Sequence, residues 1–302
     1  MILTNMKWFL KQCLQVLADV YGHFAQDEGF AVASHVALSS LMALFPFLIF
    51  VTSLAGHFGL TDFAQEVTTI IFNAWPAQVA KPVSDEIQRV LTQPRGDLLT
   101  FGVVVTLWFS SNGVEAMRVA LNRAYRVREA RPWYYCRAQS LVAVLAGSLV
   151  LVVFTVLIVF GPLIWQTLLR FFPHADMFGY HANFIRYAVT SILLVLALLG
   201  AHIVLPSGKR SFFQVLPGVV LTLGLWLVTG AAFGEYLARF ANYVSIYAGL
   251  AGVMTALVFM YLTAVIFILG GEFNASIMRL RKINRWRAQG SDGDALTRLP
   301  PL

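Results

Sequence analysis

Long apolar segments separated by short polar stretches dominate the pattern of residues along this chain. A helix needs about 20 apolar residues to cross the hydrocarbon of a bilayer. Six segments are apolar enough to be such spans: Phe30–Ala55, Leu98–Met117, Ser140–Trp165, Ile185–Leu205, Phe213–Leu237 and Ile246–Ala275. The pattern therefore predicts an all-α integral membrane protein with six transmembrane helices.

The segment before the first predicted span is amphipathic rather than uniformly apolar. Apolar residues recur at helical spacing between Met6 and Phe24, whereas Lys7, Lys11 and Asp19 interrupt any continuous apolar run. This pattern fits a helix lying in the membrane interface, and it fits a soluble helix capping the bundle equally well. Its apolar stripe consists of Leu10, Leu14, Leu17, Tyr21 and Phe24.

The predicted organisation has three parts. Residues 1–28 form the amphipathic interfacial helix, residues 29–276 form the transmembrane domain, and residues 277–302 form a basic tail, disordered in its last part, Gln289–Leu302. Within the transmembrane domain, the connection Gly56–Asp97 carries two further amphipathic patterns on either side of Trp75-Pro76. We expect two short helices there, covering the outer mouth of the bundle.

Basic residues give the predicted bundle an orientation. Of the 22 lysines and arginines, sixteen lie in the N-terminal segment, in the connections after the second and fourth spans, or in the tail. Because cytoplasmic loops are enriched in Lys and Arg, these segments are predicted to be cytoplasmic. An even number of spans then places both termini in the cytoplasm.

Composition agrees with a membrane location and weakens several alternatives. The chain is 58% hydrophobic and 12% charged, whereas soluble domains carry about 25% charged residues. The net charge is +7, and the basic residues lie beside the apolar segments. Membrane topology therefore explains the charge without a nucleic-acid partner. Cys13 and Cys136 match no zinc spacing and are predicted to be inert thiols. No phosphate-binding loop, metal-binding helix or nucleophile elbow occurs in the sequence.

Several stretches of the sequence resemble one family of bacterial inner-membrane proteins. They are SHVALSSLMALFPFLIF at 34–50, WFSSNGVEAMRVALNRAYRVREARPW at 108–133, LPG at 216–218, Trp226, and SIYAGLAGVMTALVFMYLTAVIFILGGEFNA at 245–275. In these stretches the chain resembles the YihY/virulence factor BrkB family, formerly named ribonuclease BN. The resemblance implies an inner-membrane location and an association with virulence, and the family's architecture favours transport. One departure is His35, because the family often has aromatic residues around that position.

Polar residues inside the predicted spans are the candidates for a substrate path, because ionisable groups in hydrocarbon are costly. The candidates are His35, Ser39, Ser111, Glu115, Arg118, Glu272 and Asn274. The alternative for Glu115 is a structural ion pair with Arg118, and the alternative for Glu272 and Asn274 is helix packing beside Gly270 and Gly271. We expect Glu115, Arg118, Glu272 and Asn274 to converge in the cytoplasmic half of the bundle.

Two further predictions concern polar residues near the ends of spans. Glu235 and Arg239 are four residues apart and are predicted to form a local ion pair. His202 lies near the end of the fourth span and is predicted to be solvated at the interface.

The sequence favours a transporter or flippase for a lipid, a lipid precursor or a small osmolyte. The alternatives are an envelope-assembly scaffold and, less favoured, a membrane-associated ribonuclease. A nuclease would normally gather carboxylates around two metal ions, and the cytoplasmic acids here are scattered. We therefore expect no catalytic residue, metal or cofactor; the expected partners are membrane lipids, a lipid or small-molecule substrate, and a second copy of the chain.

Overall fold

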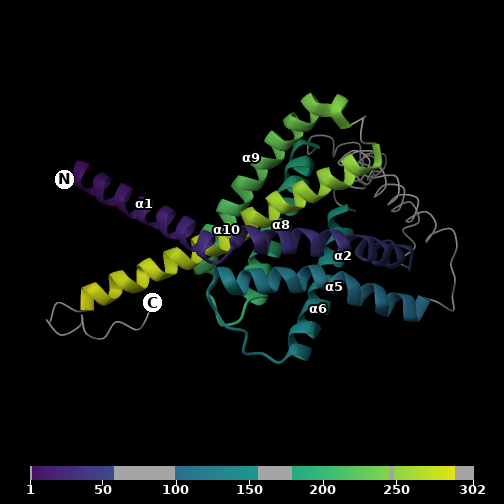
Figure 1. Cartoon of the computed structure of the whole chain (residues 1–302), viewed down its shortest axis with the longest axis horizontal. Helices are drawn as coiled ribbons and strands as arrows, with labels where there is room; N and C mark the ends of the chain where they lie inside the picture. Colours follow the sequence, from purple (N-terminus) through teal and green to yellow (C-terminus); the bar gives the residue numbers. More distant parts are fainter. Residues whose placement is uncertain (1, 58–98, 156–178, 245–247, 290–302) are drawn as a thin grey trace.

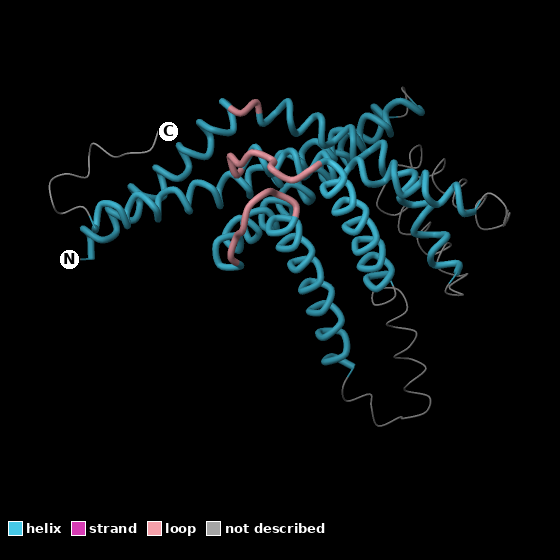
Figure 2. The backbone as a smooth tube through the Cα atoms, turned by 90° about the horizontal axis from the view of Figure 1, so that it is seen from below, coloured by secondary structure: helices cyan, strands magenta, loops and turns pink. Residues whose placement is uncertain are grey.

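The computed structural model describes residues 2–57, 99–155, 179–244 and 248–289, and the elements in these ranges are helices joined by short turns and loops (Figure 2). Its long helices are α1 (Ile2–Gln26), α2 (Gly29–His57), α5 (Leu99–Ala124), α6 (Trp133–Thr155), α8 (Gly179–Val204), α9 (Phe212–Val244) and α10 (Ala248–Gln289). The predicted all-α class is confirmed for the part of the chain that the structure describes.

A helix occupies each segment predicted to span the membrane, over all or part of its length. Within the described residues, three stretches could cross a bilayer by length and composition: Trp133–Val153, Phe212–Leu237 and Val253–Trp286. Two shorter apolar stretches, Gly29–Leu44 and Ala188–Val204, belong to α2 and α8. At most 28% of the residues in the three longer apolar windows are buried inside the protein. Such apolar and largely uncovered helices need a lipid environment; six spans remain a prediction.

Several helices extend beyond their predicted boundaries. For example, helix α5 continues past Met117 to Ala124, and α10 continues past Ala275 to Gln289, through the first half of the basic tail. The two short helices expected between Gly56 and Asp97 lie outside the described residues, apart from the end of α2, and so does the tail after Gln289.

Small residues let α5 lie close to its neighbours. Ala116, Ala120 and Ala124 recur every four residues and are all buried, so they form one stripe along α5. This stripe packs with Ala33 of α2 and Ile268 of α10 in one apolar cluster. Short side chains allow helix backbones to approach closely, and α2 and α5 lie side by side in Figure 1.

A second apolar cluster joins α5 to α8, α9 and α10. It contains Leu121, Leu199, Val215, Val219 and Phe267, all of them buried. In Figure 1, α9 runs beside α10, and both run obliquely to α2 and α5 in that view. The ends of α5 and α8, the start of α9 and the middle of α10 are brought together, and most of the polar contacts are found there.

Helix α1 packs against α10 along a face that shares Phe24 with its predicted apolar stripe and otherwise uses different residues. Val16, Val20 and Phe24 are buried, and Ser276 of α10 donates to the carbonyl oxygen of Val16. The predicted stripe mostly points outward: Leu14 and Tyr21 are 64% and 72% exposed. An outward apolar stripe is what a helix in the membrane interface would present to lipid; the interfacial position of α1 stays a prediction.

Candidate functional site

The loop after α5 begins with a strained residue. The amide of Val127 donates to the carbonyl of Asn122 at 2.9 Å, and that of Arg126 donates to Arg123 at 2.8 Å. This is the Schellman pattern that ends many helices, and it requires a left-handed residue, usually glycine. Here Arg126 takes that position with φ of 53°. Glycine would adopt this left-handed conformation at a lower cost in free energy. The presence of arginine here therefore points to a role for its guanidinium group.

The turn between α1 and α2 contains the second strained residue. Glu28 also has φ of 53°, and it directly precedes α2. In the described part of the chain, Glu28 and Arg126 are the non-glycine residues with positive φ. Left-handed conformations cost such residues roughly 1–2 kcal/mol each, and they concentrate at functional sites.

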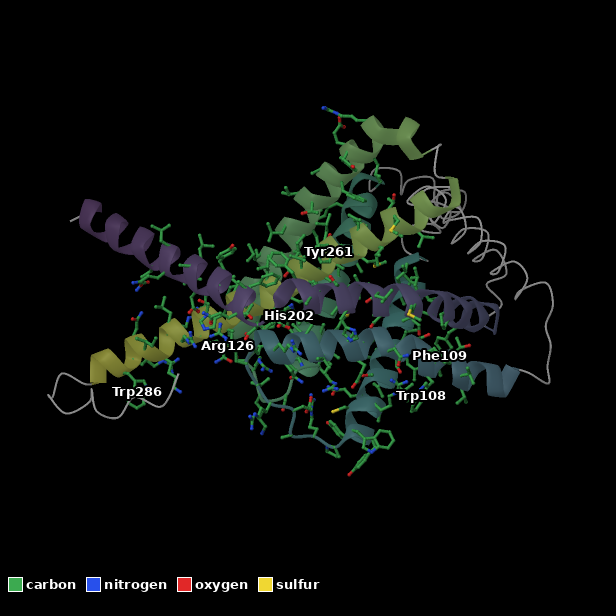
Figure 3. All side chains as sticks on the ribbon, in the orientation of Figure 1. Trp108, Phe109, Arg126, His202, Tyr261 and Trp286 are labelled. Atoms are coloured by element: carbon green, nitrogen blue, oxygen red, sulfur yellow. The ribbon has the colours of Figure 1, made fainter. Side chains whose placement is uncertain are left out.

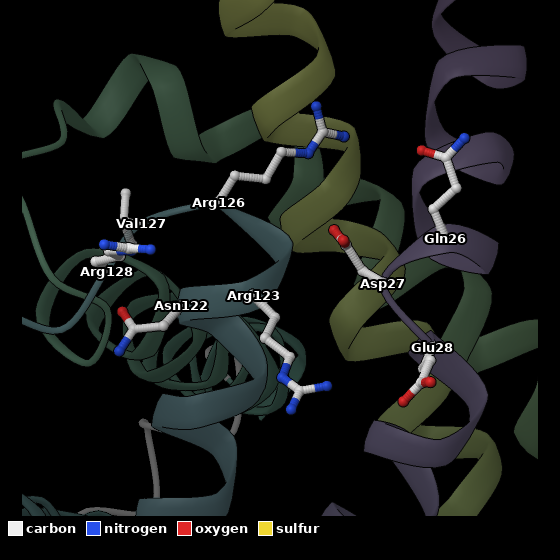
Figure 4. A pocket seen from close by; sticks show the side chains of 8 residues that line it. All are labelled: Gln26, Asp27, Glu28, Asn122, Arg123, Arg126, Val127 and Arg128. Carbon is white, nitrogen blue, oxygen red and sulfur yellow. The ribbon is translucent and has the colours of Figure 1, made fainter. Parts of the chain in front are cut away.

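Both strained residues line one cleft of about 410 Å³. Figure 4 shows the acids of the α1–α2 turn facing the arginines at the end of α5 across this cleft. Its lining residues are Gln26, Asp27, Glu28, Asn122, Arg123, Arg126, Val127 and Arg128. The cleft is therefore charged, with carboxylates on one wall and guanidinium groups on the other.

A buried ion pair lies beside the cleft. The Arg126 Nη2 atom is 3.1 Å from the Glu272 Oε2 atom, and the Glu272 side chain is 1% exposed. Arg126 Nε and Asp27 Oδ2 are buried and lack hydrogen-bond partners among the described residues. Buried polar atoms normally have a partner in the protein or in bound water, so this cleft retains capacity to bind a polar ligand.

A larger ionic network surrounds Arg118 and fixes the α5–α6 loop. Arg118 donates to both Glu115 and Glu129, and Ser140 of α6 donates to Glu115 at 2.9 Å. Glu129 also accepts from Asn122 at 2.9 Å and from Arg131 Nε at 2.7 Å. This network thus ties the end of α5 to α6 and to the loop between them.

Glu129 is the most strongly stabilised carboxylate of that loop. Hydrogen bonds from Arg131 hold the pKa of the Glu129 carboxyl far below its usual range, and those from Asn122 and Arg118 add to the effect. Asn122 in turn accepts from the Ser207 amide at 2.7 Å, and Arg131 donates to the carbonyl of Leu205 at 2.8 Å. The loop after α5 and the loop after α8 are therefore held together.

Asn274 is the junction between α9, α10 and the end of α5. Its Oδ1 accepts from the Gly218 amide at 2.6 Å, and its Nδ2 donates to the Val215 carbonyl at 2.9 Å. The same Nδ2 lies 3.1 Å from the Tyr125 hydroxyl, which is 3.0 Å from His202 Nδ1. His202 is fully buried, so the prediction that it is solvated at the interface is wrong.

The predicted substrate-path residues are divided among these networks. Glu115 pairs with Arg118, whereas Glu272 pairs with Arg126, which the candidate set omitted. Both pairs adjoin the α5–α6 loop, but Arg118 does not bridge the two acids. Asn274 belongs to the junction just described, and Ser111 is buried and donates to the carbonyl of Trp108 at 2.8 Å.

The two candidates on α2 lie apart from the cleft. His35 is exposed and Ser39 is half-buried in the single chain, and neither lines the charged cleft. Their role in a substrate path stays a prediction. Glu235 and Arg239 form the expected pair, with 2.8 Å between Oε1 and Nε, and this prediction is confirmed.

Sequence reasoning missed Asp27, Glu28, Arg126 and Glu129 because they lie in turns outside the apolar segments. The sequence feature that could have indicated this cleft is the arginine-rich stretch after the second span, which the positive-inside rule explains by topology alone. Among the described residues, no group of three or more His, Cys, Asp or Glu side chains is arranged to hold a metal ion.

The apolar and largely uncovered helices, with polar networks buried at one end, define a helical membrane protein. The chain belongs to the virulence factor BrkB family, whose sequence pattern matches residues 20–293. The resemblance noted in the sequence is thereby confirmed. No solved structure matches the chain.

Related proteins carry names of two kinds. A Bacillus subtilis protein named ribonuclease-like protein YfkH is 30% identical over 89% of this chain and 98% of its own length. A UPF0761 membrane protein of Rhodospirillum centenum is 27% identical over 90% of this chain, but the match spans only 59% of that protein. A UPF0761 membrane protein of Alteromonas mediterranea is 22% identical over 92% of this chain and 94% of its own. These names support membrane location and leave the activity open.

Proposed function

We propose that this protein transports a lipid, a lipid precursor or a small osmolyte across the bacterial inner membrane. The charged cleft at the α1–α2 turn would be the cytoplasmic entrance of the path. The proposal includes the six-span topology, with both termini in the cytoplasm. It leaves the direction of transport and the energy source open.

The observation that carries the proposal is the pair of left-handed residues that line the cleft. Glu28 and Arg126 belong to different turns and carry opposite charges, yet both adopt φ of 53° at the border of one cavity. A purely structural turn would gain stability from glycine at either position. Keeping a charged side chain there favours a binding role for the cleft.

The charges of the cleft favour a substrate that carries both signs. Asp27 and Glu28 would receive a cationic group, and Arg123, Arg126 and Arg128 would receive a phosphate or carboxylate. A zwitterionic lipid headgroup and a zwitterionic osmolyte share this chemistry. The volume of about 410 Å³ lies within the range of small-molecule sites, roughly 300–1,000 Å³.

The test uses purified protein reconstituted into liposomes. One arm measures transbilayer movement of a fluorescent phosphatidylethanolamine, and the other measures release of entrapped glycine betaine. We expect one of the two fluxes, and we expect Glu272→Gln to reduce it at least tenfold per folded molecule. Glu235→Gln is the matched control, because that glutamate also pairs with an arginine but is 63% exposed at the distant end of α9.

Glu28→Gly separates binding from folding in the same assay. Glycine relieves the left-handed strain at φ of 53° while removing a carboxylate from the cleft. We therefore expect an equal or higher thermal midpoint together with a lower flux. If flux is absent for both substrates, or if Glu272→Gln behaves like Glu235→Gln, the transport proposal is wrong and the envelope-assembly scaffold becomes the better hypothesis.

A further inference from the structure

A second cavity lies between the start of α9 and the end of α10, away from the charged cleft. It measures about 450 Å³ and is lined by Gln214, Met278, Lys282, Arg285 and Trp286. We call it the tail groove. On α10 these residues are spaced by four, seven and eight positions from Met278, so they share one face of the helix. Figure 3 shows Trp286 near the C-terminal end of α10, distant from Arg126 and His202.

The tail groove differs from the cleft in carrying positive charge alone. Its lining contains Lys282 and Arg285 and no acidic residue. Two other basic side chains of this end are occupied: Arg279 binds Asp19 at 3.0 Å, and Arg131 binds Glu129. By contrast, no ion pair or hydrogen bond of the Lys282 or Arg285 side chains occurs among the described residues. These two cations are therefore available to an anion.

Gln214 adds a neutral hydrogen-bond donor to the groove. Its Oε1 accepts from the Ser211 amide at 2.9 Å, which is the reciprocal capping contact at the start of α9. With the oxygen engaged, the amide nitrogen is the part of this side chain that can serve a ligand, and it can only donate. Two cations and one donor suit the oxygens of a phosphate group.

Exposed aromatic residues place the groove at the level of the membrane surface. Phe213 at the start of α9 is 74% exposed, and Trp133 at the start of α6 is also 74% exposed. Tyr134 and Trp286 are exposed as well. Tryptophan and tyrosine side chains collect at the headgroup level of a bilayer, and Gln214 follows the exposed Phe213 directly. This position favours a lipid headgroup over a free phosphate as the anion.

We propose that the tail groove binds the headgroup of an anionic phospholipid from the cytoplasmic leaflet. Lys282 and Arg285 hold the phosphate, the Gln214 amide donates to one of its oxygens, and Met278 and Trp286 contact the apolar part of the lipid. This site is separate from the transport path and does not depend on it. It gives α10, which extends beyond the predicted membrane boundary, an attachment to the membrane surface.

The test is native mass spectrometry of the full-length protein titrated with lipid in detergent. Phosphatidylglycerol is compared with phosphatidylcholine, and glycerol 3-phosphate serves as the free headgroup. We expect Lys282→Gln and Arg285→Gln each to weaken phosphatidylglycerol binding about fivefold, as one basic residue near a membrane surface typically contributes. Arg281→Gln is the matched control, because it removes one exposed charge from the neighbouring position but does not line the groove.

The expected pattern is a preference for phosphatidylglycerol that both groove variants lose and the Arg281→Gln control keeps. Equal loss in all three variants would mean that the basic tail attracts anionic lipid without a site, and the proposal would fail. Equal binding of phosphatidylglycerol and phosphatidylcholine by the unaltered protein would also overturn it. Displacement of bound lipid by millimolar glycerol 3-phosphate would identify a soluble phosphate site instead.

Discussion

At the scale of single residues, the charged side chains of this protein differ in how many of their hydrogen-bonding atoms have a partner. Glu129 accepts hydrogen bonds from three side chains, and each bond is made inside the protein. Arg126 has one partner, Glu272, and keeps a buried Nε without one among the described residues. A saturated carboxylate stabilises a loop, whereas an incompletely satisfied guanidinium can still receive a ligand. This contrast separates the structural network at Arg118 from the cleft at Arg126.

The saturation of Glu129 predicts how stability depends on pH. Because arginine and asparagine donors lower the folded pKa of Glu129, the folded state binds this proton less readily than the unfolded state. The resulting stabilisation is complete above the ordinary glutamate pKa of about 4.5 and is lost as the pH falls below it. Glu129→Gln should therefore lower the free energy of unfolding at pH 7 by about 2 kcal/mol and flatten its decline between neutral and acidic pH.

The measurement for Glu129 is the thermal midpoint of purified protein from pH 7 through the ordinary glutamate pKa of about 4.5 and down to about pH 3. Glu235→Gln removes a carboxylate from an exposed arginine pair and should change the midpoint little, because such pairs contribute little. An unchanged pH dependence in Glu129→Gln would contradict the stabilising role of the loop network.

At the scale of elements, the contact between α9 and α10 depends on glycine at two facing positions. A Cβ atom added to Gly218 would collide with the Gly270 carbonyl and with the Asn274 amide, and one added to Gly270 would collide with Thr222 Oγ1. The Asn274 hydrogen bonds to the start of α9 are possible only at this separation. The buried hydrogen bonds of Asn274 therefore depend on the close contact between α9 and α10. Small residues and interhelical hydrogen bonds are common where membrane helices pack together.

This contact predicts opposite effects for two glycine substitutions in α9. Gly218→Ala should lower the free energy of unfolding by about 1–3 kcal/mol, as overpacking typically does. Gly224→Ala in the same helix meets nothing within 4 Å, so it should be neutral or slightly stabilising, because alanine favours helix. Thermal unfolding of both variants, followed by tryptophan fluorescence, checks the difference. Equal midpoints would show that α9 and α10 are not in close contact at Gly218.

Sequence patterns predicted the elements far better than the contacts between them. The apolar segments located the helices α2, α5, α6, α8, α9 and α10, because burial in lipid demands long runs of apolar residues. They did not reveal that Tyr125 reaches His202 across 77 positions, or that Arg126 rather than Arg118 meets Glu272. Such pairings depend on helix rotation and depth, which hydropathy leaves undetermined. The charged cleft was missed for the same reason, since it joins two turns far apart in the chain.

At the scale of the whole molecule, polar contacts gather where α5 and α8 end, where α9 begins and along the middle of α10. The Arg118 network, the Glu272 pair and the Asn274 junction all adjoin loops at that end. The helices leading away from it have exposed apolar side chains, such as Leu227 of α9 at 77% and Val142 of α6 at 63%. In a bilayer this arrangement gives a polar layer at the cytoplasmic surface and a lipid-facing body, if the predicted orientation holds.

The last prediction concerns the orientation of the chain in the membrane, and the same experiment tests the number of spans. With the N-terminus inside, six spans place residues 85 and 176 in the periplasm and residues 126 and 209 in the cytoplasm. Single cysteines are introduced at Asp85, Arg126, Asp176 and Lys209 in a variant whose Cys13 and Cys136 are replaced by serine and alanine, and intact cells are treated with a membrane-impermeant maleimide. We expect labelling at 85 and 176 and protection at 126 and 209 until the cells are permeabilised. This alternation requires α2, α5, α6 and α8 each to cross the membrane, including the two whose apolar stretches are short. Labelling at 126 or 209 in intact cells would contradict the orientation, and protection at both 85 and 126 would show that α2 and α5 do not span.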